Sequence, residues 1–551
     1  MPAVAPSVLP APSLRPRHPV GATLAVIANR AGAEPPAGAG GPVQGAPADL
    51  RITGITHRAQ QSRPGDMFAA LPGSQAHGSS FARDAVRAGA VAILTDPAGA
   101  VALHGVATDR GVRVPVLVVD RPRAVLGAVA SAVYGDPSRQ LTVVGITGTS
   151  GKTTTCYLLD AALAADGSTT GLIGTVETRI AGEVAPSALT TPEAPDLQAL
   201  FAVMVERGVR AVAMEASSHA LALGRVAGTS YAVGAFTNLS QDHLDFHHDM
   251  RQYFEAKSLL FDGRAARHVI MVDDPWGERL ASAHPGAITV SGVGGPADWA
   301  AIHVTPGPDG RQHVTLRGPS GRLVTLDLAL PGAFNVANAA LALACVDVLG
   351  RDVQQAADAM AAVSVPGRME RVSAGQEFLA VVDYAHKPAA LAAVLDAISV
   401  GLTGRLIVLI GAGGERDAGK RPVMGAEAAR RADLVIVTDD NPRSEDPARI
   451  RAEVIAGARG FANSTAGADA TDGTDGTAGT SRAARESEVL EIPDRRAAIR
   501  AAVHAARAGD AVVIAGKGHE RGQNVGGVVH SFSDRDELTA ALTELIAGAG
   551  A

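Results

Sequence analysis

Lysine is nearly absent from this sequence. Only five of the 551 residues are lysine, and arginine supplies the other 44 of the 49 basic side chains. Arginine cannot replace lysine where a compact ammonium binds phosphate, or where an amine must lose its proton to react. GC-biased coding would explain the scarcity, but not the placement of lysines in motifs rich in glycine and histidine. The five are Lys152, Lys257, Lys387, Lys420 and Lys517.

Cysteine, aromatic residues and long apolar runs are also scarce. The two cysteines, Cys156 and Cys345, are far apart and provide no disulfide framework, which suits a reducing cytosol. No run of 18 apolar residues can span a membrane, and the N-terminus lacks the pattern of a signal peptide. A net charge of −7 without a long basic run argues against nucleic acid as a partner. We therefore expect a cytoplasmic protein without membrane insertion, acting as a monomer.

The length predicts two to four domains, and alternating apolar strands and Ala-rich helices predict an α/β fold. Residues 1–48 are rich in Pro and Ala, so we expect a disordered tail there. Domains are expected at 49–139, 140–365 and 366–551, with a flexible insert at 462–486. Four near-continuous apolar strands in the last domain predict a doubly wound parallel sheet. These strands begin at Leu379, Leu406, Leu434 and Ala511.

A phosphate-binding loop is predicted between Gly145 and Thr155. A buried strand leads into Thr147-Gly-Thr-Ser-Gly-Lys-Thr-Thr, and an Ala/Leu helix follows. Glycines let backbone N–H groups surround phosphate oxygens, and the helix N-terminus adds a partial positive charge. Lys152 would reach the β- and γ-phosphates of ATP, and Thr153 would ligate Mg²⁺. The general pattern expects Gly where Ile146 stands, and the alternative is a glycine-rich turn without a ligand.

Two further segments place metal-type ligands after strands. Glu215 ends the segment that starts at Ala211, and His243 lies among carboxylates after a strand that begins at Ala232. Ligands of open α/β sheets bind at the carboxyl ends of strands, so both side chains are candidates for holding nucleotide-bound Mg²⁺. Alone, His243 is equally well explained as a capping or surface histidine.

Taken together, the motifs resemble those of the Mur ligases of peptidoglycan synthesis, in order and spacing, from about residue 50 onwards. The resemblance implies a small N-terminal α/β domain for the uridine nucleotide, a central P-loop ATPase-like domain and a C-terminal Rossmann-like domain. The segments that carry it are Thr147-Gly-Thr-Ser-Gly-Lys-Thr-Thr, Glu215-Ala-Ser-Ser-His, Asn238-Leu-Ser-Gln-Asp-His-Leu-Asp, Pro331-Gly-Ala-Phe-Asn-Val-Ala-Asn-Ala, Pro366-Gly-Arg-Met-Glu and Asp383-Tyr-Ala-His.

Asp440-Asn-Pro-Arg resembles the motif of family members that add meso-2,6-diaminopimelate rather than lysine. Diaminopimelate has one more carboxylate than lysine, and Arg443 can bind a carboxylate through two charge-assisted hydrogen bonds. Lysine would leave that guanidinium unpaired and bring an ammonium towards it. Without the resemblance, a surface turn after a strand is as good an explanation.

The resemblance implies roles for further residues. ATP would be bound by Thr147, Gly148, Thr149, Ser150, Gly151, Lys152, Thr153, Thr154, Asn335, Asn338, Arg368 and His386. UDP-MurNAc-L-Ala-D-Glu would be held by Thr190, Thr191, Ser218 and Arg225. Diaminopimelate would be held by Arg416, Asp440, Asn441, Pro442, Arg443, Gly516 and Glu520. Mg²⁺ would be held by Thr153, Glu215, His243 and Lys257, and the catalytic set would be Lys152, Lys257, His243 and Glu215.

Lys257 is implied to be carbamylated. Addition of CO₂ to a neutral lysine amine gives a carboxylate on a long arm, which arginine cannot form because it stays protonated. The alternative is an exposed helix lysine. One segment departs from the family, because Arg58, Ala59 and Gln60 stand where relatives carry Asp-Ser-Arg for the uridine nucleotide.

The implied reaction is ATP-dependent amide formation. The γ-carboxylate of the D-glutamyl residue attacks the γ-phosphate of ATP, and the amine of diaminopimelate then displaces phosphate from the acyl phosphate. Two rival hypotheses are a folylpolyglutamate synthetase-like ligase, which should lack the first domain, and a P-loop nucleotide-binding protein without ligase activity.

Overall fold

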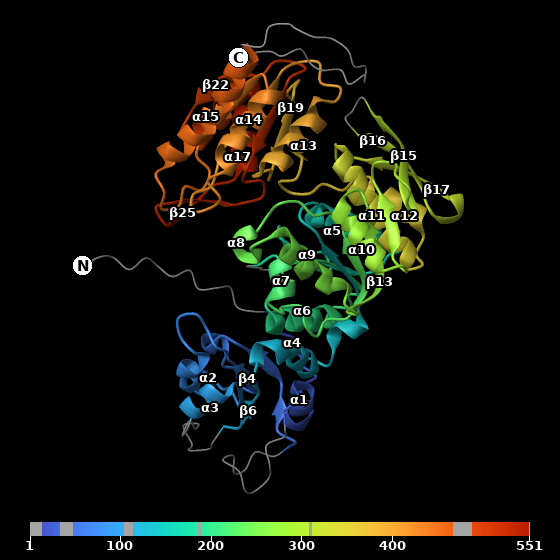
Figure 1. The fold of residues 1–551 in the computed structure, drawn as a ribbon, viewed down its shortest axis with the longest axis vertical. Helices are drawn as coiled ribbons and strands as arrows, with labels where there is room; N and C mark the ends of the chain where they lie inside the picture. The colour runs from blue at the N-terminus through green and yellow to red at the C-terminus, as the bar shows by residue number, and fades with distance from the viewer. Residues whose placement is uncertain are drawn as a thin grey trace, which may run out of the picture. The chain divides into compact units, whose positions relative to one another are not determined.

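The computed structural model describes residues 14–33, 48–103, 114–185, 189–307, 311–466 and 487–549 (Figure 1). The chain forms two compact units. The first consists of Met1–Ile302, Thr315–Thr325 and Ala337–Met360, and the second of His303–Val314, Leu326–Val336 and Ala361–Ala551.

The N-terminal part of the first unit contains a parallel sheet with the order β3-β4-β5-β6. Its helix α4 packs against α6 of the central part, and small residues of α6 complete the apolar core around α4. The strands are β3 (Gly54–Thr56), β4 (Asp66–Ala69), β5 (Ala92–Thr95) and β6 (Val116–Val118). The helices are α2 (Ala82–Arg87), α3 (Pro97–Ala102) and α4 (Pro122–Val133), with 3₁₀ turns at Ala59–Gln61, Gly78–Phe81 and Pro137–Gln140.

The expectation of a disordered tail over 1–48 is wrong for residues 14–33. Strand β1 (Ala22–Thr23) pairs with β2 (Arg51–Ile52), and helix α1 (Leu24–Ala31) follows β1. The Thr23 side chain caps the helix by accepting a hydrogen bond from the Val26 N–H. The helix buries Leu24, Ile27, Ala28 and Ala31, whose spacing of three and four residues places them on one face. The remainder of the predicted tail, apart from Ala48, lies outside the described residues.

The central sheet of the described chain has the order β10-β9-β8-β11-β7-β12-β13-β14-β15-β16-β17. Strands β8, β11, β7, β12, β13, β14 and β15 pair in parallel, so the carboxyl ends of β7, β11 and β12 lie at one edge. The strands are β7 (Thr142–Thr147), β8 (Thr170–Ile173), β9 (Thr178–Ile180), β10 (Glu183–Ala185), β11 (Ala211–Glu215), β12 (Tyr231–Phe236), β13 (Ala265–Met271), β14 (Ile288–Ser291), β15 (Trp299–Pro306), β16 (Gln312–Arg317) and β17 (Leu323–Leu328).

Helices connect these strands. They are α5 (Lys152–Ala164), α6 (Ala194–Glu206), α7 (Ser218–Ala222), α8 (Leu244–His247), α9 (Met250–Ser258), α10 (Pro275–Ala283), α11 (Ala333–Val348) and α12 (Val353–Met360), with 3₁₀ turns at Leu259–Phe261 and Pro319–Gly321.

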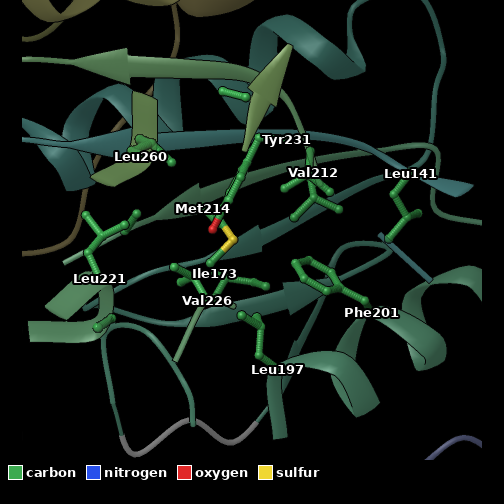
Figure 2. Close-up of a cluster of buried hydrophobic side chains, with 14 of the residues drawn as sticks. Leu141, Ile173, Leu197, Phe201, Val212, Met214, Leu221, Val226, Tyr231 and Leu260 are labelled. Atoms are coloured by element: carbon green, nitrogen blue, oxygen red, sulfur yellow. The ribbon is translucent and has the colours of Figure 1, made fainter. Parts of the chain in front are cut away.

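One apolar core holds the face of the central sheet against α6 and α7. Figure 2 shows Val212 and Met214 of β11 in this core, with Leu197 and Phe201 reaching it from α6. Strands buried on both faces need continuous apolar sequence, which explains the run Ala211-Val-Ala-Met. Burial of such side chains contributes about 1.5–3 kcal/mol each, so the core fixes the edge at which these strands end.

The second unit is built on a sheet with the order β18-β19-β23-β20-β21-β22. All neighbours pair in parallel except β18 with β19. The strands are β18 (Glu370–Arg371), β19 (Leu379–Asp383), β20 (Leu406–Ile410), β21 (Leu434–Val437), β22 (Glu488–Glu491) and β23 (Ala511–Ala515), with a separate hairpin of β24 (Gly522–Val525) and β25 (Val528–Ser531). The helices are α13 (Pro388–Ser399), α14 (Lys420–Arg431), α15 (Pro447–Ala466), α16 (Arg495–Ala505) and α17 (Asp534–Ala549).

The predicted α/β class is confirmed, with the four expected apolar strands at β19, β20, β21 and β23. The predicted insert at 462–486 begins inside α15, and residues 467–486 lie outside the described residues. Cys156 and Cys345 are both free and buried. Among the described residues, no helix combines the length and apolar character needed to cross a membrane.

Candidate active site

The phosphate-binding loop has the predicted strand–loop–helix form. Strand β7 ends at Thr147, four loop residues follow, and α5 begins at Lys152. Gly148 and Gly151 have φ angles of 147° and 87°, which L-residues with side chains rarely adopt. A Cβ at Gly151 would lie 2.3 Å from Asn338 Oδ1, so the loop passes close to α11. The N-terminus of α5 has no side-chain cap, which leaves its first N–H groups available to an anion.

The residue pair Thr237 and Asn238, after β12, holds this loop in place. The Ser150 N–H donates to Asn238 Oδ1 at 3.0 Å, and Thr237 Oγ1 donates to the Ser150 carbonyl at 2.7 Å. The Thr149 N–H also donates to the Asn238 carbonyl at 2.9 Å. These bonds join the ends of two neighbouring strands and preorganise the loop. Thr154, also predicted, is buried on the first turn of α5.

Two of the five lysines meet at one loop carbonyl. Lys152 Nζ donates to the carbonyl oxygens of Gly148 and Thr149, both at 2.9 Å. Lys257 Nζ donates to the same Gly148 oxygen at 2.6 Å and lies 4.4 Å from the centre of the Tyr253 ring. Lys257 is only 1% exposed, so the alternative of an exposed helix lysine is wrong.

Glu215 is the buried carboxylate of this edge. Its Oε1 accepts hydrogen bonds from Thr153 Oγ1 at 2.9 Å and from the Thr175 N–H at 2.8 Å. Its Oε2 accepts from Thr175 Oγ1 at 3.0 Å. Glu215 and Thr153 thus place a carboxylate and a hydroxyl directly beside the phosphate loop. Such hard oxygen ligands suit Mg²⁺.

The residues predicted to bind the UDP-linked substrate lie around Glu215. Thr190 Oγ1 is 3.0 Å from Thr175 Oγ1, and Thr191 Oγ1 donates to the Glu215 carbonyl at 2.8 Å. Arg225 lies 2.8 Å from a Glu193 carboxylate oxygen and donates to the Thr191 carbonyl at 3.5 Å. These contacts connect the substrate candidates to the proposed metal ligands.

His243 lies at the edge of a cluster of rings that includes His219 and Tyr253. It has a left-handed backbone at φ 53°, precedes α8, and pairs with Asp242 at 3.1 Å. Its ring centre is 4.8 Å from that of His219 and 6.2 Å from that of Tyr253, whose ring also contacts Lys257. The side chain is 47% exposed and therefore accessible to a ligand.

His247 is the buried member of this cluster. Its Nε2 is 3.0 Å from Oγ of Ser218, a predicted substrate residue. Burial, assisted by the neighbouring His219 and Lys257, lowers the pKa of His247 to about 4, so its ring is neutral at pH 7. The described residues contain no group of three or more His, Cys, Asp or Glu side chains arranged to hold a metal ion. A metal here would depend on the Thr153 hydroxyl and on a modified Lys257 as well.

Two nucleotide candidates of the second unit, Arg368 and His386, contact Tyr384. The Arg368 guanidinium lies 4.3 Å from the centre of the Tyr384 ring, and His386 Nδ1 donates to the Tyr384 carbonyl at 2.8 Å. Burial lowers the pKa of His386 to about 4, with Lys387 as the next cause. Asn335 donates to the Pro331 carbonyl at 2.8 Å in the same unit. Asn338 belongs to the first unit, where its Oδ1 accepts from Thr155 Oγ1 at 3.3 Å.

The amino-acid candidates of the second unit converge after β21 and β23. Asn441 Nδ2 donates to Glu520 Oε2 at 2.9 Å, and Asp440 is buried. Gly516 has φ 118°, and a Cβ there would lie 2.7 Å from Asp440 Oδ2. Arg443 adopts φ 53° and donates to the Gly414 carbonyl, so it contacts the loop that carries the exposed Arg416. Pro442 is buried in the same turn.

Sequence reasoning missed several residues of both clusters. Thr175, Asn238 and Tyr253 contact Glu215, the phosphate loop and Lys257, respectively. Lys517 stands in a glycine- and histidine-rich segment, and its amine bonds both to Glu520 in that segment and to Asn441, 76 residues away. Asn238 opened one of the family motifs but was given no role, and the position of Thr175 just after a strand of the same sheet is a second sequence signal.

Comparison with known proteins gives a consistent result. Three family models match: "Mur ligase family, catalytic domain" at 51–134, "Mur ligase middle domain" at 146–346 and "Mur ligase, glutamate ligase domain" at 367–518. A Corynebacterium glutamicum protein named UDP-N-acetylmuramoyl-L-alanyl-D-glutamate–2,6-diaminopimelate ligase is 54% identical over 87% of this chain and 89% of its own length.

A Streptomyces avermitilis protein of the same name is 47% identical and covers 96% of this chain and 98% of its own. Among solved structures, one described as a UDP-N-acetylmuramoyl-L-alanyl-D-glutamate–2,6-diaminopimelate ligase matches with a TM-score of 0.64 and 29% identity. It covers 96% of this chain and 100% of that one.

Proposed function

The chain belongs to the Mur ligase family, and we propose that it joins meso-2,6-diaminopimelate to UDP-MurNAc-L-Ala-D-Glu in peptidoglycan synthesis, converting ATP to ADP and phosphate. The observation that carries the proposal is full-length similarity, at 47–54% identity, to proteins named for this reaction. The match at 51–134 argues against the folylpolyglutamate rival, which was expected to lack the first domain. The enzyme acts as a cytoplasmic monomer.

ATP binds through the phosphate loop of the first unit. The N–H groups of the loop and of the uncapped N-terminus of α5 donate to the phosphate oxygens. Lys152 moves its ammonium from loop carbonyls to the β- and γ-phosphate oxygens. Asn338 lies beside Gly151 and helps to position the nucleotide. Asn335, Arg368 and His386 bind the adenine and ribose, and stacking on Tyr384 keeps the Arg368 guanidinium in place.

Mg²⁺ fits the oxygen ligands beside the loop. Thr153 and Glu215 would hold one ion, and His243 with a carbamylated Lys257, which both neighbour the Tyr253 ring, would hold a second. Bound Mg²⁺ supplies charge neutralisation at the phosphate oxygens. Carbamylation requires the uncharged amine of the buried Lys257, since only that form adds CO₂.

The first chemical step brings two anions together. The γ-carboxylate of the D-glutamyl residue attacks the γ-phosphorus, the bond to the bridging oxygen of ADP breaks, and an acyl phosphate forms. Lys152 neutralises charge on the transferred phosphoryl group, and Thr190, Thr191, Ser218 and Arg225 orient the UDP-linked substrate. Catalysis here consists of positioning and electrostatics.

The second step forms the amide bond. The neutral amine of diaminopimelate attacks the acyl carbon, phosphate leaves, and the amine proton is lost to solvent. Arg443 binds the distal carboxylate of the amino acid, supported by Arg416, while Asp440 and Glu520 attract its ammonium. Asn441, Pro442 and Gly516 shape the pocket, since Asn441 is bonded to Glu520 and Gly516 approaches Asp440.

Phosphate release from ATP tests the proposal. With UDP-MurNAc-L-Ala-D-Glu present, we expect release with meso-diaminopimelate, far less with L-lysine and none with glutamate. Equal activity with lysine would refute the acceptor assignment. ATP binding without any acceptor-dependent release would favour the non-catalytic alternative, and release with glutamate and a folate substrate would favour the folylpolyglutamate rival.

A further inference from the structure

Lys517 is the most deeply buried of the five lysines. It follows β23, and its side chain is fully buried. Nζ donates to Asn441 Oδ1 at 3.0 Å and to Glu520 Oε2 at 3.2 Å, and it lies 3.7 Å from Asp440 Oδ1. One ammonium therefore contacts three of the residues proposed to form the amino-acid pocket.

These contacts fix the orientation of the Asn441 amide. Its Oδ1 accepts from Lys517 Nζ and, at 2.9 Å, from the Asn524 N–H of strand β24. Both groups are donors only, so the atom facing them must be the oxygen. The Asn441 NH₂ group then points to Glu520 Oε2, with one N–H used in that bond. Its second N–H has no hydrogen-bond acceptor among the described residues, so it can bind an acceptor such as a carboxylate.

Charge gives Lys517 a second effect. Asp440 and Glu520 carry two negative charges, and the ammonium between them offsets one. The three side chains together retain one negative charge, which matches one substrate ammonium. The nearby buried Arg495 is bonded to Asp534 through two contacts of 2.7 Å, so its charge is already matched.

The choice of lysine also fits the geometry. This unit buries Arg421 and Arg495 in ion pairs, so buried arginine is tolerated in the fold. The acceptors around Lys517 come from three residues in different directions. A compact ammonium can reach all three from one nitrogen, whereas a guanidinium spreads its donors over a larger planar group.

We propose that Lys517 is a positioning residue for the amino-acid substrate. It holds the Asn441 amide and the Glu520 carboxylate in the orientation that binds the zwitterionic end of diaminopimelate, without touching the substrate itself. The proposal rests on the proposed function. The competing explanation is a buried ion pair that only stabilises the fold.

Steady-state kinetics of Lys517→Met and Lys517→Gln test the proposal. Met keeps the volume but removes the donors, and we expect the KM for diaminopimelate to rise about 10- to 100-fold, as for loss of a charged hydrogen bond. The KM values for ATP and the UDP-linked substrate should stay within about twofold. Gln retains an NH₂ donor and should recover part of the loss. Arg496→Met, an exposed ion-pair residue of the same unit, is the control and should leave all three KM values unchanged.

A double variant separates positioning from stability. If Lys517 acts through Asn441, then Lys517→Met in an Asn441→Ala background should raise the KM for diaminopimelate little further. Lowered thermal stability with unchanged KM, or an equal rise of all three KM values, would overturn the proposal. If Lys517→Met does not fold, Lys517→Gln carries the same comparison. An inactive wild-type protein would instead refute the proposed function.

Discussion

Replacement of Lys257 by arginine is the most informative single perturbation of the first unit. Lysine and arginine carry the same charge, so Lys257→Arg preserves a cation above the Tyr253 ring and a donor to the Gly148 carbonyl. The variant loses the capacity to form a carbamate, because arginine does not lose its proton. A basic residue with a purely structural role would survive the exchange.

The size of the effect follows from the environment of Lys257. At 1% exposure the larger guanidinium must displace neighbours, which costs about 1–3 kcal/mol of stability. Loss of one preorganised charged group near the transferred phosphoryl group lowers kcat by about 10²- to 10³-fold. We therefore expect folded protein with a kcat at least about a hundredfold lower.

Phosphate release with saturating substrates, together with thermal unfolding, measures both effects. Arg251→Lys is a matched control, because it makes the reverse exchange at an exposed site on the same helix, α9. In ¹³C-bicarbonate, wild-type protein should show a carbamate carbon signal that Lys257→Arg lacks. A variant with near-wild-type kcat, or a signal that persists in it, would refute the carbamate hypothesis.

Four further predictions concern both units. Gly151→Ala should raise the KM for ATP at least about tenfold, since the new Cβ would collide with Asn338. Gly167→Ala is the control: it has similar left-handed backbone strain but no atom near the new Cβ, and it should leave the KM for ATP unchanged. Arg443→Lys should lower kcat/KM for diaminopimelate about 10- to 100-fold, because one ammonium replaces a bidentate guanidinium contact. An unchanged ratio of kcat/KM for diaminopimelate to kcat/KM for L-lysine as the acceptor would contradict this. Arg495→Met leaves the buried Asp534 unpaired and should cost about 3–5 kcal/mol in urea unfolding, whereas the exposed pair lost in Arg496→Met should cost at most about 1 kcal/mol. Burial lowers the pKa of His386 to about 4 in the folded protein, so between pH 6.5 and 4 the unfolded chain binds a proton at this ring and the folded protein does not. The free energy of unfolding should therefore fall over that range by at most about 3 kcal/mol more in wild type than in His386→Gln.

Local patterns predicted the elements that hold the phosphate site. The run before Gly148 is apolar on both faces, and the glycine turn and helix follow within a few residues, so strand, loop and helix were all visible in one segment. Glu215 was predicted because it ends such a strand. In each case, neighbouring residues in the sequence carried the whole signal.

Contacts between distant segments could not be predicted in this way. Thr175 bonds to a carboxylate 40 residues away, and Lys517 bonds to an asparagine 76 residues away, so no local spacing indicates either pair. Strand β22 was missed because Glu488-Val-Leu-Glu is a short, mostly exposed edge strand. Helix α1 was missed because its four buried residues stand inside a segment rich in proline, alanine and glycine.

The Gly148 carbonyl sets a limit on how tightly the loop can bind nucleotide. Lys152 donates to this oxygen, so a phosphate that attracts the Lys152 ammonium competes with the backbone for it. The measured affinity is then the difference between two sets of hydrogen bonds. A weak net affinity for the triphosphate is compatible with strong individual contacts. Release of ADP is assisted when the hydrogen bond from Lys152 to the Gly148 carbonyl forms again.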